Sequence, residues 1–168
     1  RAEASRDDSE RPDLYGKAVS EYDLAIEAGP SRVAFYDEAG VALTRWGKPD
    51  LALQRFAQAD ALTHPTSERL SRIADAMLAQ GDSAGARALY QRALDLDARS
   101  APAQAGLAGL DRAAGDLTSA LDRAQKAARY QMRNWLYHRD LAILYRDTGD
   151  AQDGLAQPRT ARLWAPAW

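Results

Sequence analysis

The sequence predicts an all-α solenoid made of helix–turn–helix repeats, with about nine helices in total. Four glycines recur at a spacing of 34 residues, at Gly47, Gly81, Gly115 and Gly149. Small, aromatic and helix-capping residues follow the same spacing along most of the chain. A fixed period of this length is typical of stacked helix pairs, because each pair needs its neighbours to bury its apolar face.

The composition limits the classes of partner. The 168 residues include 22 basic and 24 acidic side chains, which gives a net charge of −2. No nucleic-acid partner is expected, since such a partner calls for a basic excess. No membrane insertion is expected either, because no apolar run approaches the roughly 18 residues of a spanning helix. The absence of cysteine excludes disulfides, thiolate nucleophiles and cysteine metal sites.

The chain is expected to begin with a flexible charged lead-in over residues 1–13, which are apolar only at alanines. A partial helix packed on the first repeat is the alternative. The helical period starts at Leu14, and Gly29-Pro30 should end that first helix, since proline cannot continue it. The repeat domain therefore covers residues 14–168. It divides into a half repeat and four full units: 14–32, 33–66, 67–100, 101–134 and a degenerate unit at 135–168.

Each unit carries start signals for its two helices in one register. Pro49 suits the first turn of a second helix, where no amide hydrogen bond is lost. Side chains that accept hydrogen bonds from first-turn amides stand at the expected starts of the other helices. They are Thr66, Ser100 and Asn134 before first helices, and Asp82, Asp116 and Asp150 before second helices.

The last unit departs from the pattern. Pro158 stands in the column that is aromatic in earlier units, so the final helix should be kinked or split there. The end of the chain holds three large apolar residues without a polar helix to cover them: Leu163, Trp164 and Trp168. Either the array is cut short here, or this end is a hydrophobic surface that binds a partner or a second copy.

The columns resemble the tetratricopeptide repeat. That family's 34-residue unit has small residues where its two helices approach, and aromatic residues that fill the gaps between units. Residues 33–66 match nearly all of it, with Tyr36, Ala39-Gly40, Leu43, Gly47, Ala52, Phe56 and Ala59. The resemblance covers residues 14–168. It implies a right-handed superhelix and leaves the function open, because the family hosts many unrelated roles.

The resemblance also implies where a protein or peptide partner would bind. In the family, the first helices of the units line a concave groove that holds a segment of another protein. The columns that would face this groove hold Asp37, Val41, Arg45, Ser71, Asp75, Ala105, Gly109, Arg112, Leu136, Arg139, Ile143 and Arg146.

The groove chemistry implied by these columns is mixed. The row with Ala105 and Gly109 is unusually small and leaves room for a bulky ligand group, while the arginines would pair with acidic side chains. The family's carboxylate clamp, which grips the acidic tail of heat-shock chaperones, needs a Lys/Asn/Lys/Arg set. Asp37, Val41 and Asp75 stand in its positions, so a chaperone role of that type is not expected.

No catalytic function is expected. Residues 81–85 match the G-x-S-x-G pattern of a serine nucleophile, but here the pattern falls on a turn between two helices rather than after a strand. The two histidines, His64 and His138, do not have metal-ligand spacing, so neither a metal nor another cofactor is expected.

The sequence therefore favours a non-catalytic scaffold that binds a partner segment in the groove. Two alternatives stay open: an assembly module of a larger bacterial envelope or export complex, and a regulatory domain attached to an enzyme on a longer chain. Self-association through the C-terminal end is one form of the first alternative. The excess of arginine over lysine hints at a bacterial source, with the cytoplasm or periplasm as the compartment, and we expect a fragment of a longer protein.

Overall fold

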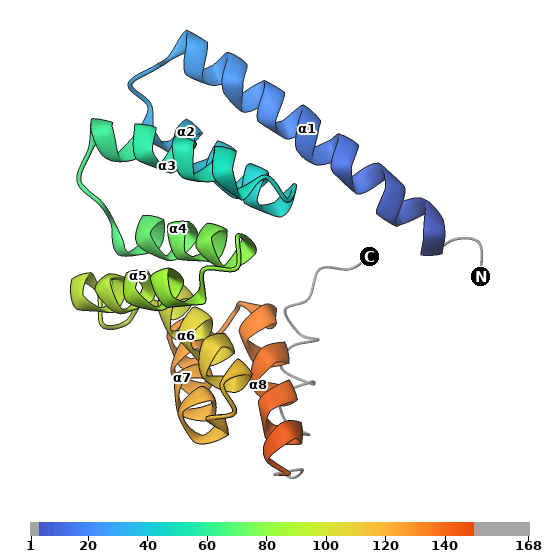
Figure 1. The fold of residues 1–168 in the computed structure, drawn as a ribbon, viewed down its shortest axis with the longest axis vertical. Coiled ribbons are helices and arrows are strands. Elements are labelled where there is room, and N and C mark those ends of the chain that lie inside the picture. Colours follow the sequence, from blue (N-terminus) through green and yellow to red (C-terminus); the bar gives the residue numbers. More distant parts are fainter. Residues whose placement is uncertain (1–3, 150–168) are drawn as a thin grey trace. The chain divides into compact units, whose positions relative to one another are not determined.

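The computed structural model describes the backbone of residues 4–149 and the side chains of residues 14–149. This part of the chain is all-α, as the sequence predicts, and has eight helices (Figure 1). The ninth expected helix lies outside the described residues. The helices are α1 (Ala4–Ala28), α2 (Val33–Arg45), α3 (Pro49–Leu62), α4 (Ser67–Ala79), α5 (Ser83–Leu96), α6 (Ala101–Ala113), α7 (Leu117–Tyr130) and α8 (Trp135–Thr148).

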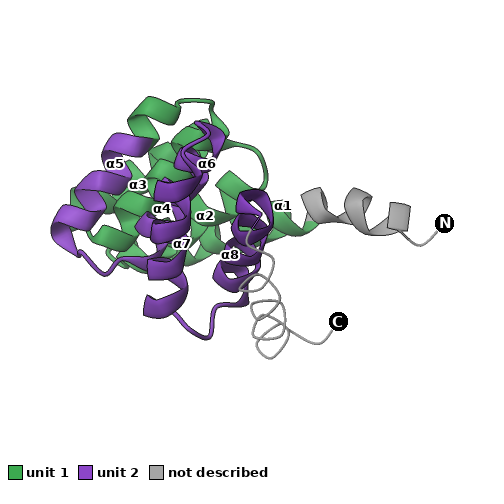
Figure 2. Ribbon diagram, turned by 90° about the horizontal axis from the view of Figure 1, so that it is seen from below, with its two compact units in different colours: residues 1–86 green, residues 87–168 purple. Residues whose placement is uncertain are grey.

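The chain divides into two compact units, coloured separately in Figure 2. Unit 1 covers residues 1–86 and holds α1 to α4 with the first residues of α5. Unit 2 covers residues 87–168 and holds the remainder of α5 with α6, α7 and α8. Within unit 1, α2 packs against α1, α3 and α4, and within unit 2, α7 packs against α6 and α8.

The four repeat glycines break the helices where the sequence predicts. Gly47, Gly81, Gly115 and Gly149 have φ angles of 76°, 89°, 83° and 80°, and they are the positive-φ residues of the described chain. This left-handed conformation turns the chain out of a helix and suits glycine, which has no Cβ to clash with the backbone. The 34-residue spacing is therefore a spacing of helix ends.

Most of the expected caps form. The side chain of Thr66 accepts a hydrogen bond from Arg69 N, and that of Asn134 accepts one from Leu136 N. Asp82 and Asp116 cap the second helices by accepting from the amides of Gly85 and Ser119, respectively. Hydrogen bonds from Ser119 lower the pKa of Asp116 below its ordinary value. Ser100 occupies its predicted cap position without a capping side-chain bond, and Asp150 lies outside the described residues.

Replacing Thr66 with alanine should lower the free energy of unfolding by about 1 kcal/mol, because one amide of the first turn of α4 loses its acceptor. Urea denaturation followed by circular dichroism measures the change. Ser100→Ala is the matched control at the next repeat and should cost less, since Ser100 caps no amide through its side chain. Equal losses for the two variants would contradict the assigned cap.

The core of unit 1 depends on a close approach between α2 and α3. Phe56 is 1% exposed, and a Cβ added at Gly40 would lie 2.6 Å from its ring. Ala39, Ala52 and Ala59 are fully buried around this contact. Small residues on both helices let the backbones come close enough for the aromatic ring to fill the gap.

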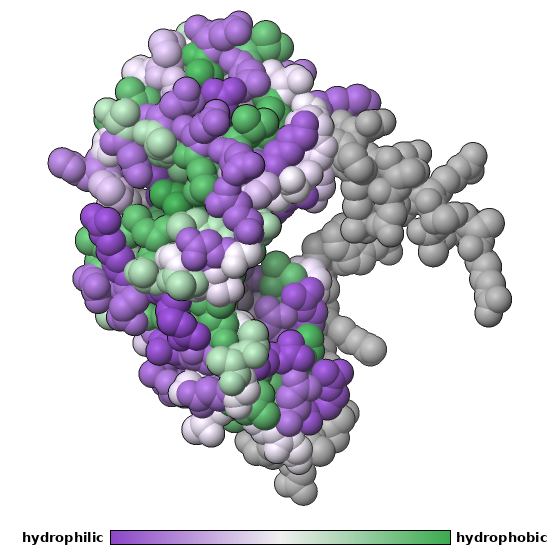
Figure 3. Space-filling model, in the orientation of Figure 1, coloured by the Kyte–Doolittle hydropathy of each residue, from purple (hydrophilic) through white to green (hydrophobic). Residues whose placement is uncertain are grey.

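Unit 2 has a close contact between α5 and α6, which belong to successive repeats. A Cβ at Gly106 would overlap the ring of Tyr90, which is almost fully buried. The alanines that the repeat places along α7 are also buried, among them Ala120, Ala124 and Ala127. On the face seen in Figure 3, hydrophobic residues lie interspersed with hydrophilic ones, which is consistent with the polar outer columns of these helices.

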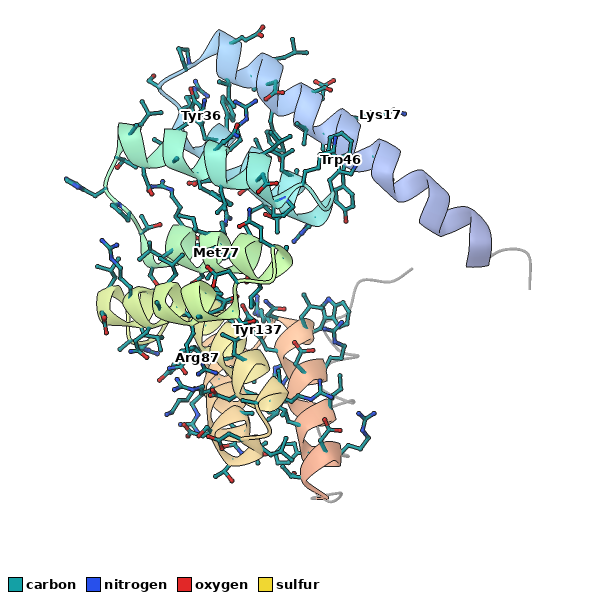
Figure 4. All side chains as sticks on the ribbon, in the orientation of Figure 1. Lys17, Tyr36, Trp46, Met77, Arg87 and Tyr137 are labelled. Atoms are coloured by element: carbon teal, nitrogen blue, oxygen red, sulfur yellow. The ribbon has the colours of Figure 1, made fainter. Side chains whose placement is uncertain are left out.

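Residues 4–13 are helical, which agrees with the alternative of a partial helix rather than with a flexible lead-in. Helix α1 begins at Ala4, so it includes residues 4–13, and it ends at Ala28, directly before Gly29. Residues 4–13 hold three aspartates, two serines and Pro12, none of which favours a helix interior, so this stretch extends a helix whose later turns are packed. That packing comes from Val19, which is buried, and from Trp46 at the end of α2, whose ring would lie 3.3 Å from a Cβ at Gly16 (Figure 4).

Candidate functional site

Most of the predicted groove residues of unit 1 take part in contacts within the protein. Asp37 on α2 accepts hydrogen bonds from Nε and Nη2 of Arg69 on α4, at 2.7 and 3.1 Å. Ser71 is 1% exposed, and its hydroxyl donates to Ser67 O within α4. Val41 is half-buried and packs on the core formed by α1, α2, α3 and α4, while Arg45 is exposed.

Arg69 organises this side of unit 1. Its side chain is 3% exposed, and it also forms an ion pair with Asp60 of α3 at 3.0 Å. The hydrogen bond with Asp37 is the main cause that raises the pKa of Arg69, against the opposing effect of burial. Asp75, in the next groove column, is exposed and also takes part in a polar interaction. The Arg69 cluster therefore joins α2, α3 and α4 and is a structural feature of unit 1.

Unit 2 differs from unit 1, because the first helices of its repeats, α6 and α8, border a pocket of about 210 Å³. Helices α6, α7 and α8, which lie together in Figure 1, all contribute to its lining. The lining residues are mostly small or apolar, with two charged residues among them: Ala105, Ala108, Gly109, Arg112, Ala124, Ala127, Tyr137, Asp140, Ile143 and Leu144. Four of them were predicted from the repeat columns as partner-binding residues: Ala105, Gly109, Arg112 and Ile143.

Gly109 borders open space at this pocket. Apart from the backbone of its own helix, no atom of the described residues lies within 4 Å of a Cβ built at Gly109. At Gly40 and Gly106, by contrast, an added Cβ meets an aromatic ring. Gly109 is therefore a helical glycine that internal packing does not require, and its missing side chain enlarges the pocket.

Charged residues of α6 and α8 form one edge of the pocket, where Arg112 and Asp140 line it and their ion-pair partners lie beside them. Asp147 accepts from Arg112 at 2.8 Å through Nε and 2.7 Å through Nη2, and from Arg146 at 2.9 Å through Nη2. The guanidinium groups of Arg146 and, second, Arg112 lower the pKa of Asp147 below its ordinary value. This carboxylate is therefore ionised at neutral pH and is shared by two cations.

The remaining predicted residues of α8 lie along the same helix at intervals of three or four residues. Leu136, in the first turn, is 39% exposed. Arg139 pairs with Asp140 at 2.7 Å, and its guanidinium lies 5.5 Å from the centre of the Trp135 ring. Along α8, the apolar side chains of Leu136 and Ile143 therefore alternate with those of Arg139 and Arg146, which form ion pairs.

The other sequence signals behave as structural elements. Ser83 begins α5, and its neighbour Asp82 caps that helix, as expected for a turn rather than a nucleophile elbow. His138 is buried, with Nε2 2.8 Å from Met132 O. Among the described residues, no group of three or more His, Cys, Asp or Glu side chains could hold a metal ion, and no helix is long and apolar enough to cross a membrane. The proposed terminal interface of Leu163, Trp164 and Trp168 lies outside the described residues.

Six of the ten lining residues were not predicted as binding residues, and Tyr137 and Asp140 are the two polar ones among them. Tyr137 lies on the side of α8 that faces α6 (Figure 4) and packs on the core of unit 2. Neither residue stands in a groove column of the repeat. A helical spacing of three from Tyr137 to Asp140, and again to Ile143, was the available signal that the three share one face of α8.

The helix pairs, the 34-residue spacing of their breaks and the small-residue contacts define a helical-repeat protein. No known family model matches the sequence. A curated relative, the small glutamine-rich tetratricopeptide repeat-containing protein 2 of Mycosarcoma maydis, is 27% identical over 94 residues. That match covers 56% of this chain and 27% of the relative, so the chain spans about a quarter of the relative's length.

Solved structures give the particular fold. TTC0263, a thermophilic TPR protein of Thermus thermophilus, has a TM-score of 0.77 at 18% identity, over 90% of this chain and 84% of its own. MamA has a TM-score of 0.62 at 18% identity, over 94% and 92%. YrrB, a TPR protein with an unusual peptide-binding site, has a TM-score of 0.55 at 17% identity, over 89% and 77%. The chain has the tetratricopeptide-repeat fold.

Proposed function

We propose that the chain is a non-catalytic scaffold that binds a segment of a partner protein on the face formed by α6 and α8. The observation that carries this proposal is the apolar pocket of unit 2, with Gly109 open beside it. YrrB, which has the same fold, has a peptide-binding site, and this supports a peptide as the class of ligand.

The size of the pocket favours a side chain over a small-molecule ligand. Pockets that bind drug-sized molecules have volumes of about 300–1,000 Å³. The pocket of unit 2 measures about 210 Å³ and is lined mostly by alanine and aliphatic carbon. It has room for one bulky group, and binding energy in protein interfaces is concentrated in such buried anchors.

Filling the pocket should block binding without unfolding the protein. In Gly109→Leu, the new side chain enters space that no described residue occupies, and leucine has a higher helix propensity than glycine. The wild-type chain and the variant are used as baits in lysate of the source organism, and the retained proteins are compared. We expect at least one protein retained by the wild type to be lost with Gly109→Leu, while the melting temperature does not fall.

The matched control is Ala88→Leu, which adds a leucine at an exposed position of α5 outside the pocket. It should retain the same proteins as the wild type. If all three baits retain the same set, the pocket is not the binding site and the proposal fails.

A further inference from the structure

We infer that the pocket of unit 2 receives one bulky apolar side chain from a partner segment whose neighbouring residues are acidic. This inference rests on the proposed function and specifies the chemistry of the ligand. It follows from two features of the pocket: its lining and the charge of its edge.

The residues that line the pocket favour an apolar group of the ligand. Ala105 and Gly109 of α6 and Ile143 and Leu144 of α8 are among the lining residues. A polar group placed against these four residues would lose hydrogen bonds to water without gaining new ones from their side chains, which is unfavourable. An aromatic or branched aliphatic side chain instead removes apolar surface from water on both partners.

The charged residues at the edge of the pocket favour a negatively charged partner segment. Arg112 lines the pocket and shares Asp147 with Arg146, and Asp140, which also lines it, pairs with Arg139. Counted over the described side chains, these three arginines and two aspartates carry a net charge of +1, on a chain whose net charge is −2.

The unbalanced positive charge lies at Asp147, whose single carboxylate pairs with two arginines. Arg112 and Arg146 both bind this one carboxylate, and their side chains are 45% and 72% exposed. Both remain accessible to a carboxylate from outside, and guanidinium groups bind carboxylates with two parallel hydrogen bonds where geometry allows. An acidic residue next to the anchor would thus neutralise the excess charge.

Short synthetic peptides test the two features separately. One peptide carries a tryptophan flanked by aspartate and glutamate in a Gly/Ser background, a second has alanine in place of tryptophan, and a third has lysines in place of the acids. Binding is followed by titration of the backbone amide signals of Gly109 and Ile143 in nuclear magnetic resonance spectra of the full chain.

We expect saturable shifts with the acidic tryptophan peptide. Removing tryptophan should weaken binding roughly tenfold or more, because the apolar anchor is lost. Exchanging the acids for lysines should weaken it roughly three- to tenfold, and added salt should reduce that difference. Equal affinity for the acidic and basic peptides, or no saturable shift with any peptide, would overturn the inference.

A charge-reversed variant provides the second arm. Arg112→Glu combined with Arg146→Glu should reverse the preference and favour the lysine peptide, with circular dichroism confirming that the helices are retained. Arg129→Glu, on the exposed side of α7 outside the pocket, is the control and should keep the acidic preference. An unchanged preference in the double variant would overturn the inference.

The two proposals fail in different ways. If Gly109→Leu abolishes partner capture while the peptides show no acidic preference, the ligand chemistry is wrong and the binding site stands. If Gly109→Leu leaves capture unchanged, the binding site itself is wrong.

Discussion

Replacing Phe56 with alanine is expected to lower the free energy of unfolding by about 3–5 kcal/mol, the range for deleting a fully buried aromatic side chain. Phe56 is 1% exposed and fills the gap between α2 and α3. The surrounding alanines are too small to close the cavity by changing rotamer, so the lost contacts are not recovered. Urea denaturation followed by circular dichroism measures the loss.

The close approach at Gly40 gives this prediction an internal control. Gly40→Ala alone should destabilise the protein, because its Cβ would lie 2.6 Å from the Phe56 ring. In the Phe56→Ala background the obstruction is gone, and the same change should be neutral or stabilising, since alanine favours a helix over glycine by roughly 0.5–1 kcal/mol. Additive effects of the two substitutions would contradict the packing of α2 against α3 described above.

Replacing Arg69 with methionine is expected to cost about 2–4 kcal/mol. Methionine keeps much of the buried volume but leaves Asp37 and Asp60 facing each other without their shared cation. Removing one partner of a buried ion pair costs about 3–5 kcal/mol, and the partial exposure of the two carboxylates reduces this figure. Urea denaturation at neutral pH is the measurement.

Arg72, three residues along α4, is the matched control. Its partners are the more exposed Glu38 and Glu68, so Arg72→Met should cost less than about 1 kcal/mol. Adding Asp37→Asn to Arg69→Met should restore part of the loss by removing one unpaired charge. Equal costs at Arg69 and Arg72 would show that burial of the Arg69 cluster contributes nothing to stability.

The helix pattern was predictable because its signals are local. The turn glycines need a left-handed backbone that other residues rarely adopt, and the capping residues act on amides two or three positions away. Such features are set by the chain within one turn of a helix. The start of α1 was less predictable, since a helix without an apolar stripe gives no periodic signal.

The candidate site was predictable only in part. Ala105, Gly109, Arg112 and Ile143 come together at the pocket because they stand in columns of the repeat that line one face of its first helices. The ion pair between Arg112 and Asp147 was not predictable, because it forms only once α6 and α8 are packed together. The other two pairs, Arg139 with Asp140 and Arg146 with Asp147, join neighbouring residues of α8.

One column shows what sequence and tertiary structure each decided. Asp37, Ser71, Ala105 and Arg139 occupy the same position in successive repeats, and the spacing alone places each of them on a first helix. Asp37 is held by an ion pair, Ser71 is buried, Ala105 lines a pocket and Arg139 is exposed. Helical periodicity determines the position of a residue along its own helix. The side chains of the neighbouring helix determine whether that residue is covered, paired or open to a partner.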